Sequence, residues 1–152
     1  MRPKAGGESP TSALPNLFQL HNDEAMSPAA TALFLVFLLQ IKHFVCDGPL
    51  QTKKMVHAKG IYGRPLGILH SAIHGMGTFV VFAATGFDWS TVLLFTALDF
   101  LIHYHIDYSK ENIVRHFGWS IAVPYFWWMI ALDQLLHHVT YLALVAYSQG
   151  LL

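Results

Sequence analysis

Four long apolar runs constrain what this chain of 152 residues can fold into more than any other feature of its sequence. The runs cover residues 29–47, 65–86, 90–107 and 124–147. Each is close in length to the roughly 20 residues that an α-helix needs to cross a membrane. Backbone amides in lipid must be paired within their own segment, which a helix achieves. The runs therefore predict an all-α protein, an integral membrane four-helix bundle.

The composition favours the same class of protein. Hydrophobic residues make up 54% of the chain and charged residues 12%, which is about half of the ~25% that is typical of soluble domains. The nine basic and nine acidic residues balance, so no excess of positive charge indicates a nucleic-acid partner. The expected surroundings are membrane lipids.

The first 28 residues differ from the rest because they carry glycine, proline, serine and mixed charges without a sustained period. This composition predicts a flexible or interfacial N-terminal tail. No apolar stretch typical of a signal peptide is expected in it. We therefore divide the chain into a tail over residues 1–28 and a four-transmembrane-helix domain over residues 29–152.

Positive charge is concentrated between the first two apolar runs, in residues 48–64. The cations there are Lys53, Lys54, Lys59 and Arg64. The positive-inside rule places this segment in the cytoplasm, together with the polar residues 108–119. We expect both segments to be surface loops and both termini to face the non-cytoplasmic side of a bacterial inner membrane. Arg2 and Lys4 near the N-terminus oppose this orientation.

Each apolar run also carries two histidine or aspartate residues four positions apart. The pairs are His43 and Asp47, His70 and His74, His103 and Asp107, and Asp133 and His137. Residues at this spacing share one face of a helix. A charged side chain at the centre of a bilayer helix costs roughly 2.5–3.5 kcal/mol on insertion scales, so such pairs indicate a partner or a function. All four pairs are expected to meet in the cytoplasmic half of the bundle.

We interpret these eight side chains as candidate metal ligands, because helix bundles hold metals with inward carboxylates and imidazoles. Eight ligands exceed the roughly four that one zinc ion takes, so two divalent transition-metal ions are predicted. Imidazole and carboxylate ligands suit zinc, manganese or iron. A purely structural network is the alternative, since a single His-x-x-x-His pair more often serves interhelical hydrogen bonding.

Asp99 lies four residues before His103 and extends the same helix stripe. It is a buried, hydrogen-bonded acid, a partner that orients a metal ligand or a catalytic residue acting as a general base. Gln51, Lys110 and Gln134 stand next to the candidate ligands in the sequence. We expect these three side chains to orient the polar group of a substrate.

The other polar and small residues of the apolar runs are expected to have supporting or packing roles. His105 and His138 are expected to support the ligands or to lie at an interface, and Cys46 to be a packed thiol. Gly75 and Gly77 would let a neighbouring helix approach closely. The remaining histidines, expected to be solvated in loops, are His21, His57 and His116.

Four motifs occur in the order HFVCDGPLQTKKMV, LHSAIHG, HYHIDYSK and LDQLLHH. Their spaced residues are His43, Asp47 and Gln51; His70 and His74; His103, Asp107 and Lys110; and Asp133, Gln134 and His137. This combined order, from about Leu38 to Tyr147, resembles the small bacterial membrane-protein family known as domain of unknown function three-three-zero-seven. The resemblance implies a fold and a site but no activity.

The leading functional hypothesis is a metal-dependent hydrolase that acts on a lipid-linked or phosphoester substrate at the cytoplasmic face. Bound metals can activate water and polarise a phosphoryl or acyl oxygen. The chain also distantly resembles predicted membrane-bound metal-dependent hydrolases. This resemblance is an analogy at the level of the fold.

Two other functions are compatible with the sequence. The order His70, His74, Gln134, His137 and His138 resembles histidine boxes of membrane desaturases and hydroxylases, which suggests a non-haem di-iron oxidase. That family's full set of boxes is not present. The second is a non-enzymatic accessory subunit of a larger membrane complex or a homo-oligomer, with a histidine ligating haem or a pigment.

Overall fold

The computed structural model describes residues 26–152, which form five α-helices and no strand. The helices are α2 (Pro28–Asp47), α3 (Lys53–Lys59), α4 (Pro65–Ala84), α5 (Trp89–His116) and α6 (Pro124–Ser148). Helices α2, α4 and α6 coincide with three of the apolar runs, and α5 contains the fourth. The predicted tail falls outside the described residues except for its last three positions, the last of which, Pro28, begins α2.

The helix starts follow from local hydrogen bonding. Ser27 Oγ and Thr52 Oγ1 accept hydrogen bonds from backbone amides in the first turns of α2 and α3, each at 3.2 Å. Asp88 caps α5 by accepting from Thr91 N at 3.0 Å. The hydrogen bonds from Ser90 and Thr91 lower the pKa of Asp88, so this exposed cap is ionised at neutral pH.

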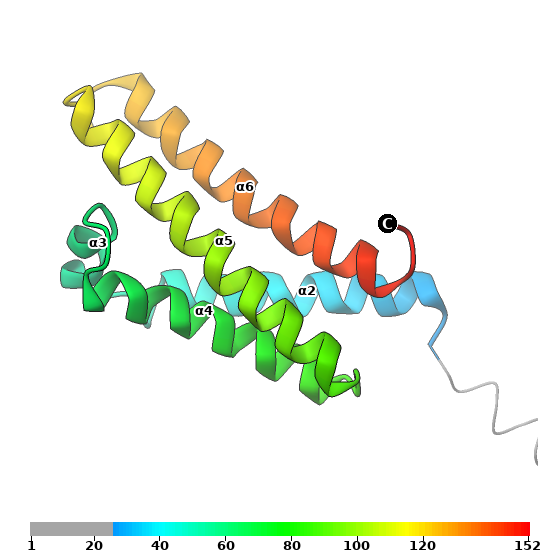
Figure 1. Ribbon diagram of the computed structural model, residues 1–152. Coiled ribbons are helices and arrows are strands. Elements are labelled where there is room, and N and C mark those ends of the chain that lie inside the picture. The colour runs from blue at the N-terminus through cyan, green and yellow to red at the C-terminus, as the bar shows by residue number, and fades with distance from the viewer. Residues whose placement is uncertain (1–25) are drawn as a thin grey trace, which may run out of the picture.

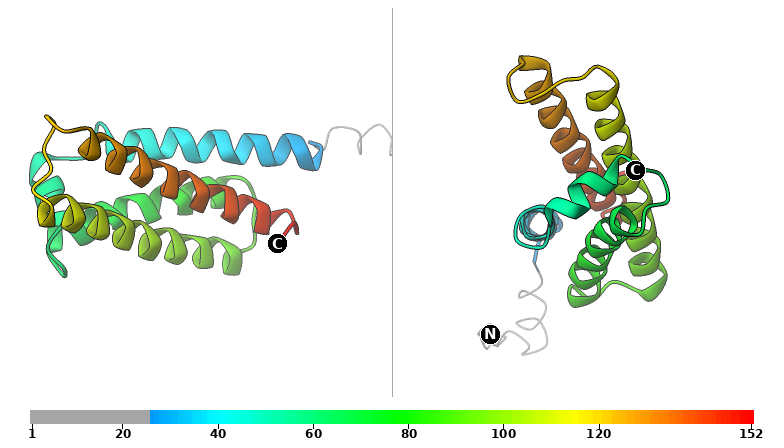
Figure 2. Two further views of the ribbon diagram at one scale, coloured as in Figure 1. Left: turned by 90° about the horizontal axis from the view of Figure 1, so that it is seen from above. Right: turned by 90° about the vertical axis from the view of Figure 1, so that its left-hand side faces the viewer.

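The four long helices run alternately in opposite directions (Figure 1). Helix α5 packs against α4 and α6, and α2 packs against the same two helices. The short helix α3 lies across one end of them and contacts α4 and α5 (Figure 2). The start of α2 and the end of α6 lie at the opposite end. Side chains from all four long helices can therefore face a common interior.

The interior is apolar at one end and polar at the other. The buried apolar cluster consists of Leu35, Leu39, Val81, Phe82, Val92, Phe95, Tyr141, Leu144 and Val145. These residues lie toward the start of α2 and the end of α6. The buried histidines and carboxylates lie toward α3, so the polar groups are concentrated at that end of the molecule.

Close approach of the helices depends on two glycines of α4, as the sequence predicts. A Cβ atom on Gly75 would lie 3.2 Å from both Thr96 O and Phe100 Cβ of α5. A Cβ atom on Gly77 would lie 2.6 Å from Lys42 Cγ of α2. Gly77 therefore leaves the space through which the Lys42 side chain enters the interior.

Helices α2, α4 and α6 are each long and apolar enough to cross a membrane. Large apolar side chains also cover their outer faces; examples are Leu33, Phe37, Val80, Trp128 and Leu142. These features indicate association with a membrane. Helix α5 is not among the three, because its polar residues, which include Asp99, His103 and His105, lower its mean hydropathy. A membrane span over residues 90–107 stays a prediction.

Two predicted surface loops are helical, so these two predictions were wrong. Residues 48–64 contain α3, whose Met55, Ala58 and Lys59 face inward at helical spacing. Helix α5 continues through most of residues 108–119. High polarity does not break a helix that has good helix formers and a packed face. His57 and His116 accordingly lie in helices, and both are exposed.

Candidate metal centre

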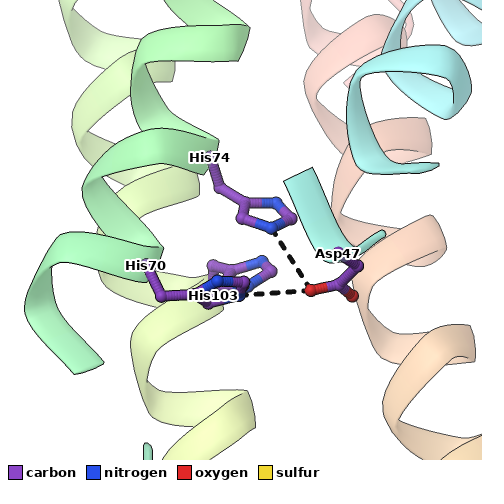
Figure 3. A group of neighbouring side chains, drawn as sticks. All are labelled: Asp47, His70, His74 and His103. Atoms are coloured by element: carbon purple, nitrogen blue, oxygen red, sulfur yellow. Dashed lines mark hydrogen bonds and ion pairs between the residues drawn. The ribbon is translucent and has the colours of Figure 1, made fainter. Parts of the chain in front are cut away.

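A group of three histidines and one aspartate occupies the polar end of the interior. His70 and His74 come from α4, His103 from α5 and Asp47 from the last turn of α2. The four side chains point toward one another (Figure 3). The imidazoles are buried, and the Asp47 side chain keeps 19% of its surface exposed. The i, i+4 spacing on α4 places both of its histidines on the inward face.

The distances within this group fit a shared ion better than direct hydrogen bonds. Asp47 Oδ1 lies 3.2 Å from His70 Nε2 and 3.4 Å from His74 Nε2. His70 Nε2 lies 3.1 Å from His103 Nε2. Charge-assisted hydrogen bonds are about 2.7–2.9 Å long. Ligands bound about 2.0–2.1 Å from a tetrahedral zinc ion are about 3.3–3.4 Å apart, which is close to the observed spacing.

Several buried side-chain atoms at this end have no hydrogen-bond partner among the described residues. They include Asp47 Oδ1, His74 Nε2, Asp133 Oδ1 and His137 Nε2. An unpaired buried polar atom costs about 1–3 kcal/mol, so their grouping requires an explanation. Carboxylate oxygens and imidazole nitrogens are the donors that zinc, manganese and iron accept. The residues present therefore fit a divalent transition-metal ion.

A second group comprises His103, Asp107 and His137. Asp107 Oδ2 lies 3.2 Å from His103 Nε2, and Asp107 Oδ1 lies 3.9 Å from His137 Nε2. Because His103 Nε2 has a single lone pair, it can bind an ion in only one of the two groups. If His103 binds an ion in the first group, a second ion would be left with Asp107 and His137 as ligands. Asp107 Oδ2 faces His70 of the first group, and Asp107 Oδ1 faces His137 of the second.

Two of the eight predicted ligands, His43 and Asp133, lie outside both groups and contact them. His43 Nε2 lies 2.9 Å from Gln134 Oε1 and 3.3 Å from Asp47 Oδ2. His43 Nδ1 lies 2.9 Å from the Tyr141 hydroxyl. Since the Gln134 oxygen can only accept, His43 carries its proton on Nε2 and accepts from Tyr141. Both ring nitrogens are thus partnered, and His43 lies beside Asp47.

Asp133 contacts the second group through His137. Its Oδ1 lies 3.6 Å from His137 Nε2, and its Oδ2 accepts a hydrogen bond of 3.3 Å from Gln134 Nε2. The structure therefore brings six of the eight predicted ligands into the two groups and places the other two beside them.

The lysine of α3 that reaches the centre was missed by the sequence analysis. Lys59 Nζ lies 3.0 Å from Asp107 Oδ2 and 3.6 Å from Asp47 Oδ1. The residue is 5% exposed, whereas the sequence analysis grouped it with the surface charges of residues 48–64. Its spacing from Met55, at i and i+4, is the signal that could have placed it on the inward face of a helix.

Asp99 lies one helical turn from His103, in a buried network that is joined to His43 through the Tyr141 hydroxyl. Its Oδ2 is 2.6 Å from Lys42 Nζ and accepts a hydrogen bond of 2.6 Å from Thr78 Oγ1. Lys42 also donates to the Tyr141 hydroxyl at 3.2 Å. The pairing of Lys42 with Asp99 was not predicted from the sequence. A catalytic role for Asp99 stays a prediction.

The three predicted substrate-orienting residues occupy different places. Gln134 lies at the centre, between His43 and Asp133. Gln51 donates from its amide to Asp47 O at 2.7 Å and so lies just beyond the end of α2. Lys110 pairs with Glu111 at 2.9 Å and lines a surface hollow together with Asp133. Their predicted role stays untested.

A hollow of about 360 Å³ between α2 and α6 reaches the centre from outside. It is lined by Gln40, His43, Phe44, Asp47, Gly48, Gln134 and His138. Asp47 is the most exposed member of the first group, and it faces this opening. Most of the lining side chains are polar, so the hollow can hold water beside Asp47.

These features define a class of protein: an all-helical chain with membrane-type helices and a candidate histidine and aspartate metal site. More particularly, the chain belongs to the family described as "Protein of unknown function (DUF3307)", whose sequence profile matches residues 34–151. The resemblance carried by the four motifs is thereby confirmed. No curated protein and no solved structure matches the chain.

Proposed function

We propose that this protein is an integral membrane, metal-dependent hydrolase acting on a lipid-linked or phosphoester substrate. The observation that carries the proposal is the convergence of unpaired, buried nitrogen and oxygen atoms from four helices at the spacing of metal ligands. The apolar outer faces of α2, α4 and α6 support a membrane-embedded four-helix bundle in which α5 supplies much of the polar interior.

Asp47, His70, His74 and His103 would hold the first ion, with Asp107 beside them. When bound, a zinc-like ion supplies Lewis acidity, which polarises a phosphoryl or acyl oxygen and makes water a better nucleophile. His43, with both ring nitrogens hydrogen-bonded, would pack beside the Asp47 ligand.

Substrate would approach through the hollow between α2 and α6, where Asp47 is exposed. The basic residues at the same end of the molecule favour a cytoplasmic location for the centre.

Metal analysis of the purified protein tests the first step. We expect at least one equivalent of zinc, manganese or iron per chain, and less than about one tenth of this in a His70→Ala/His103→Ala variant. His105→Ala is the matched control, because His105 lies on the same helix as His103 but is exposed. Circular dichroism identifies variants that have lost their helices. A wild-type protein without metal, or full metal retention in the folded double variant, would refute the proposal.

Hydrolysis is tested with the metal-loaded protein in detergent. We expect phosphate or acid release from p-nitrophenyl phosphate or from phosphatidic acid in mixed micelles, and loss of this release after treatment with a chelator. Restoration by zinc or manganese, but not by magnesium, would agree with the nitrogen-rich ligand set. Metal binding without any hydrolysis of either substrate would favour a structural role for the centre.

Lys59 supports one competing function, a purely structural charge network. Its ammonium already lies 3.0 Å from Asp107 Oδ2 and could neutralise the carboxylates without a metal ion. In that case the Lys59→Met substitution leaves a buried carboxylate unpaired and destabilises the protein by about 3–5 kcal/mol.

If the centre binds a metal ion, the Lys59→Met substitution should instead change the affinity for that ion. Removing a nearby positive charge should strengthen divalent-ion binding at least tenfold, as measured by calorimetric titration with zinc. Lys54→Met is the matched control, because Lys54 lies on the same helix but is exposed. Unchanged zinc affinity together with strong destabilisation would favour the structural network.

A further inference from the structure

A basic pocket lies on the outer side of α3, at the start of α4. Its volume is about 550 Å³. It is lined by Lys53, Lys54, His57, Ala58, Ile61, Arg64, Pro65 and Leu66. None of these residues belongs to the metal groups. The pocket is therefore separate from the centre, even though Lys59 extends from the same short helix to the other side.

The cations of this pocket are not neutralised by the protein that surrounds them. Lys53, Lys54 and Arg64 have no acidic side chain within 4.0 Å in residues 26–152, in contrast to Lys42, Lys59 and Lys110. All three are exposed. Three unpaired cations beside one concave surface attract an anionic ligand.

The pocket is held in shape by hydrogen bonds from α5. Arg115 donates to His57 O at 2.7 Å, and Asn112 donates to Gly60 O at 3.2 Å. The Tyr104 hydroxyl accepts from Gly63 N at 2.7 Å. These bonds fix α3 and the turn that follows it, so the cations are presented on a rigid frame.

The position of the pocket indicates the kind of anion. It lies where α4, one of the membrane-length helices, begins at Pro65. Its apolar wall is formed by Ala58, Ile61 and Leu66. Farther along α4, Leu69 is 46% exposed. The pocket and α4 together suit a ligand with two parts. Its anion would contact the cations of the pocket, and its hydrocarbon chain would lie along the apolar side of α4.

We propose that this pocket binds the headgroup of an anionic phospholipid, with the phosphate on Lys53, Lys54 and Arg64. The acyl chains then extend along the exposed apolar side of α4. Basic pockets at the membrane boundary are suited to this role. The proposal is independent of the metal centre and of any hydrolase activity.

Lipid retention by the full chain in detergent provides the test. Native mass spectrometry of protein mixed with equal phosphatidylglycerol and phosphatidylcholine should show a preference for phosphatidylglycerol. In Lys54→Gln/Arg64→Gln we expect this binding to weaken at least tenfold. Lys54→Arg/Arg64→Lys is the matched control, because it changes the same two side chains and keeps both positive charges. Its lipid preference should remain unchanged.

Several results would overturn this proposal. Equal retention of the two lipids by the wild-type protein would remove the headgroup preference, and unchanged binding in Lys54→Gln/Arg64→Gln would place the lipid elsewhere. Competition by millimolar inorganic phosphate as effective as that of phosphatidylglycerol would assign the pocket to free phosphate. The metal content of Lys54→Gln/Arg64→Gln should equal that of wild type. A loss of lipid binding can therefore be distinguished from a loss of the metal centre.

Discussion

Replacing Asp99 by asparagine should lower the free energy of unfolding by about 3–5 kcal/mol, because it leaves a buried charge without its partner. Lys42 Nζ lies 2.6 Å from Asp99 Oδ2, and both side chains are buried. Asparagine keeps the shape of the side chain but removes its charge. The Lys42 ammonium would then lose its counter-charge, although it keeps its hydrogen bond to Tyr141.

Thermal unfolding of the detergent-purified variants, followed by circular dichroism, measures this effect. A Lys42→Met/Asp99→Leu double variant should recover most of the lost stability, because it leaves neither charge unpaired. Asp88→Asn is the matched control on α5. Asparagine caps a helix about as well as aspartate, and Asp88 is exposed, so little change is expected. A wild-type melting temperature for Asp99→Asn, or a double variant no more stable than Asp99→Asn, would contradict this account of the pair.

The helices and the candidate ligands were predictable because both are encoded by local spacing. Each apolar run predicts a helix from its own length and composition. A pair such as His70 and His74 must share a helix face whatever surrounds it. Because neighbouring helices have similar lengths and opposite directions, a pair near the end of one helix lies level with a pair near the start of the next. The sequence therefore identified most of the residues that meet at the centre.

The partners of the buried lysines were not predictable in this way. Lys59 belongs to a basic segment whose other lysines are exposed, and only the packing of α3 across the helix ends carries it to Asp107. Lys42 reaches Asp99 across 57 positions of sequence, through space that Gly77 leaves open. Such partners depend on how helices pack, and this is a property of the tertiary structure.

The number of ions could not be derived from the count of ligands. Eight side chains suggested two ions, but the structure gives His43 two hydrogen-bonding partners and shares His103 Nε2 between both groups. Whether a side chain is free to bind an ion depends on what else it contacts. The spacing of the pairs in the sequence contains no such information.

Adding zinc to metal-free protein should raise its thermal stability substantially. An ion that binds only the folded state stabilises it by about 4 kcal/mol when its concentration is a thousand times its Kd. The physical source of this gain is the pairing of buried atoms that lack partners, such as Asp47 Oδ1 and His74 Nε2. We expect a melting temperature that rises with zinc concentration and falls again when a chelator is added.

Substitutions at the centre separate one ion from two. Asp47→Asn and His74→Ala should each abolish most of the zinc-dependent rise, because both residues belong to the first group. Asp133→Asn should leave that rise nearly intact if a single ion is bound in the first group, since Asp133 contacts His137 of the second group and no member of the first. A loss of half the bound zinc in Asp133→Asn would instead indicate a second ion near His137. A zinc-dependent rise that persists undiminished in folded Asp47→Asn and His74→Ala variants would place the zinc away from this centre.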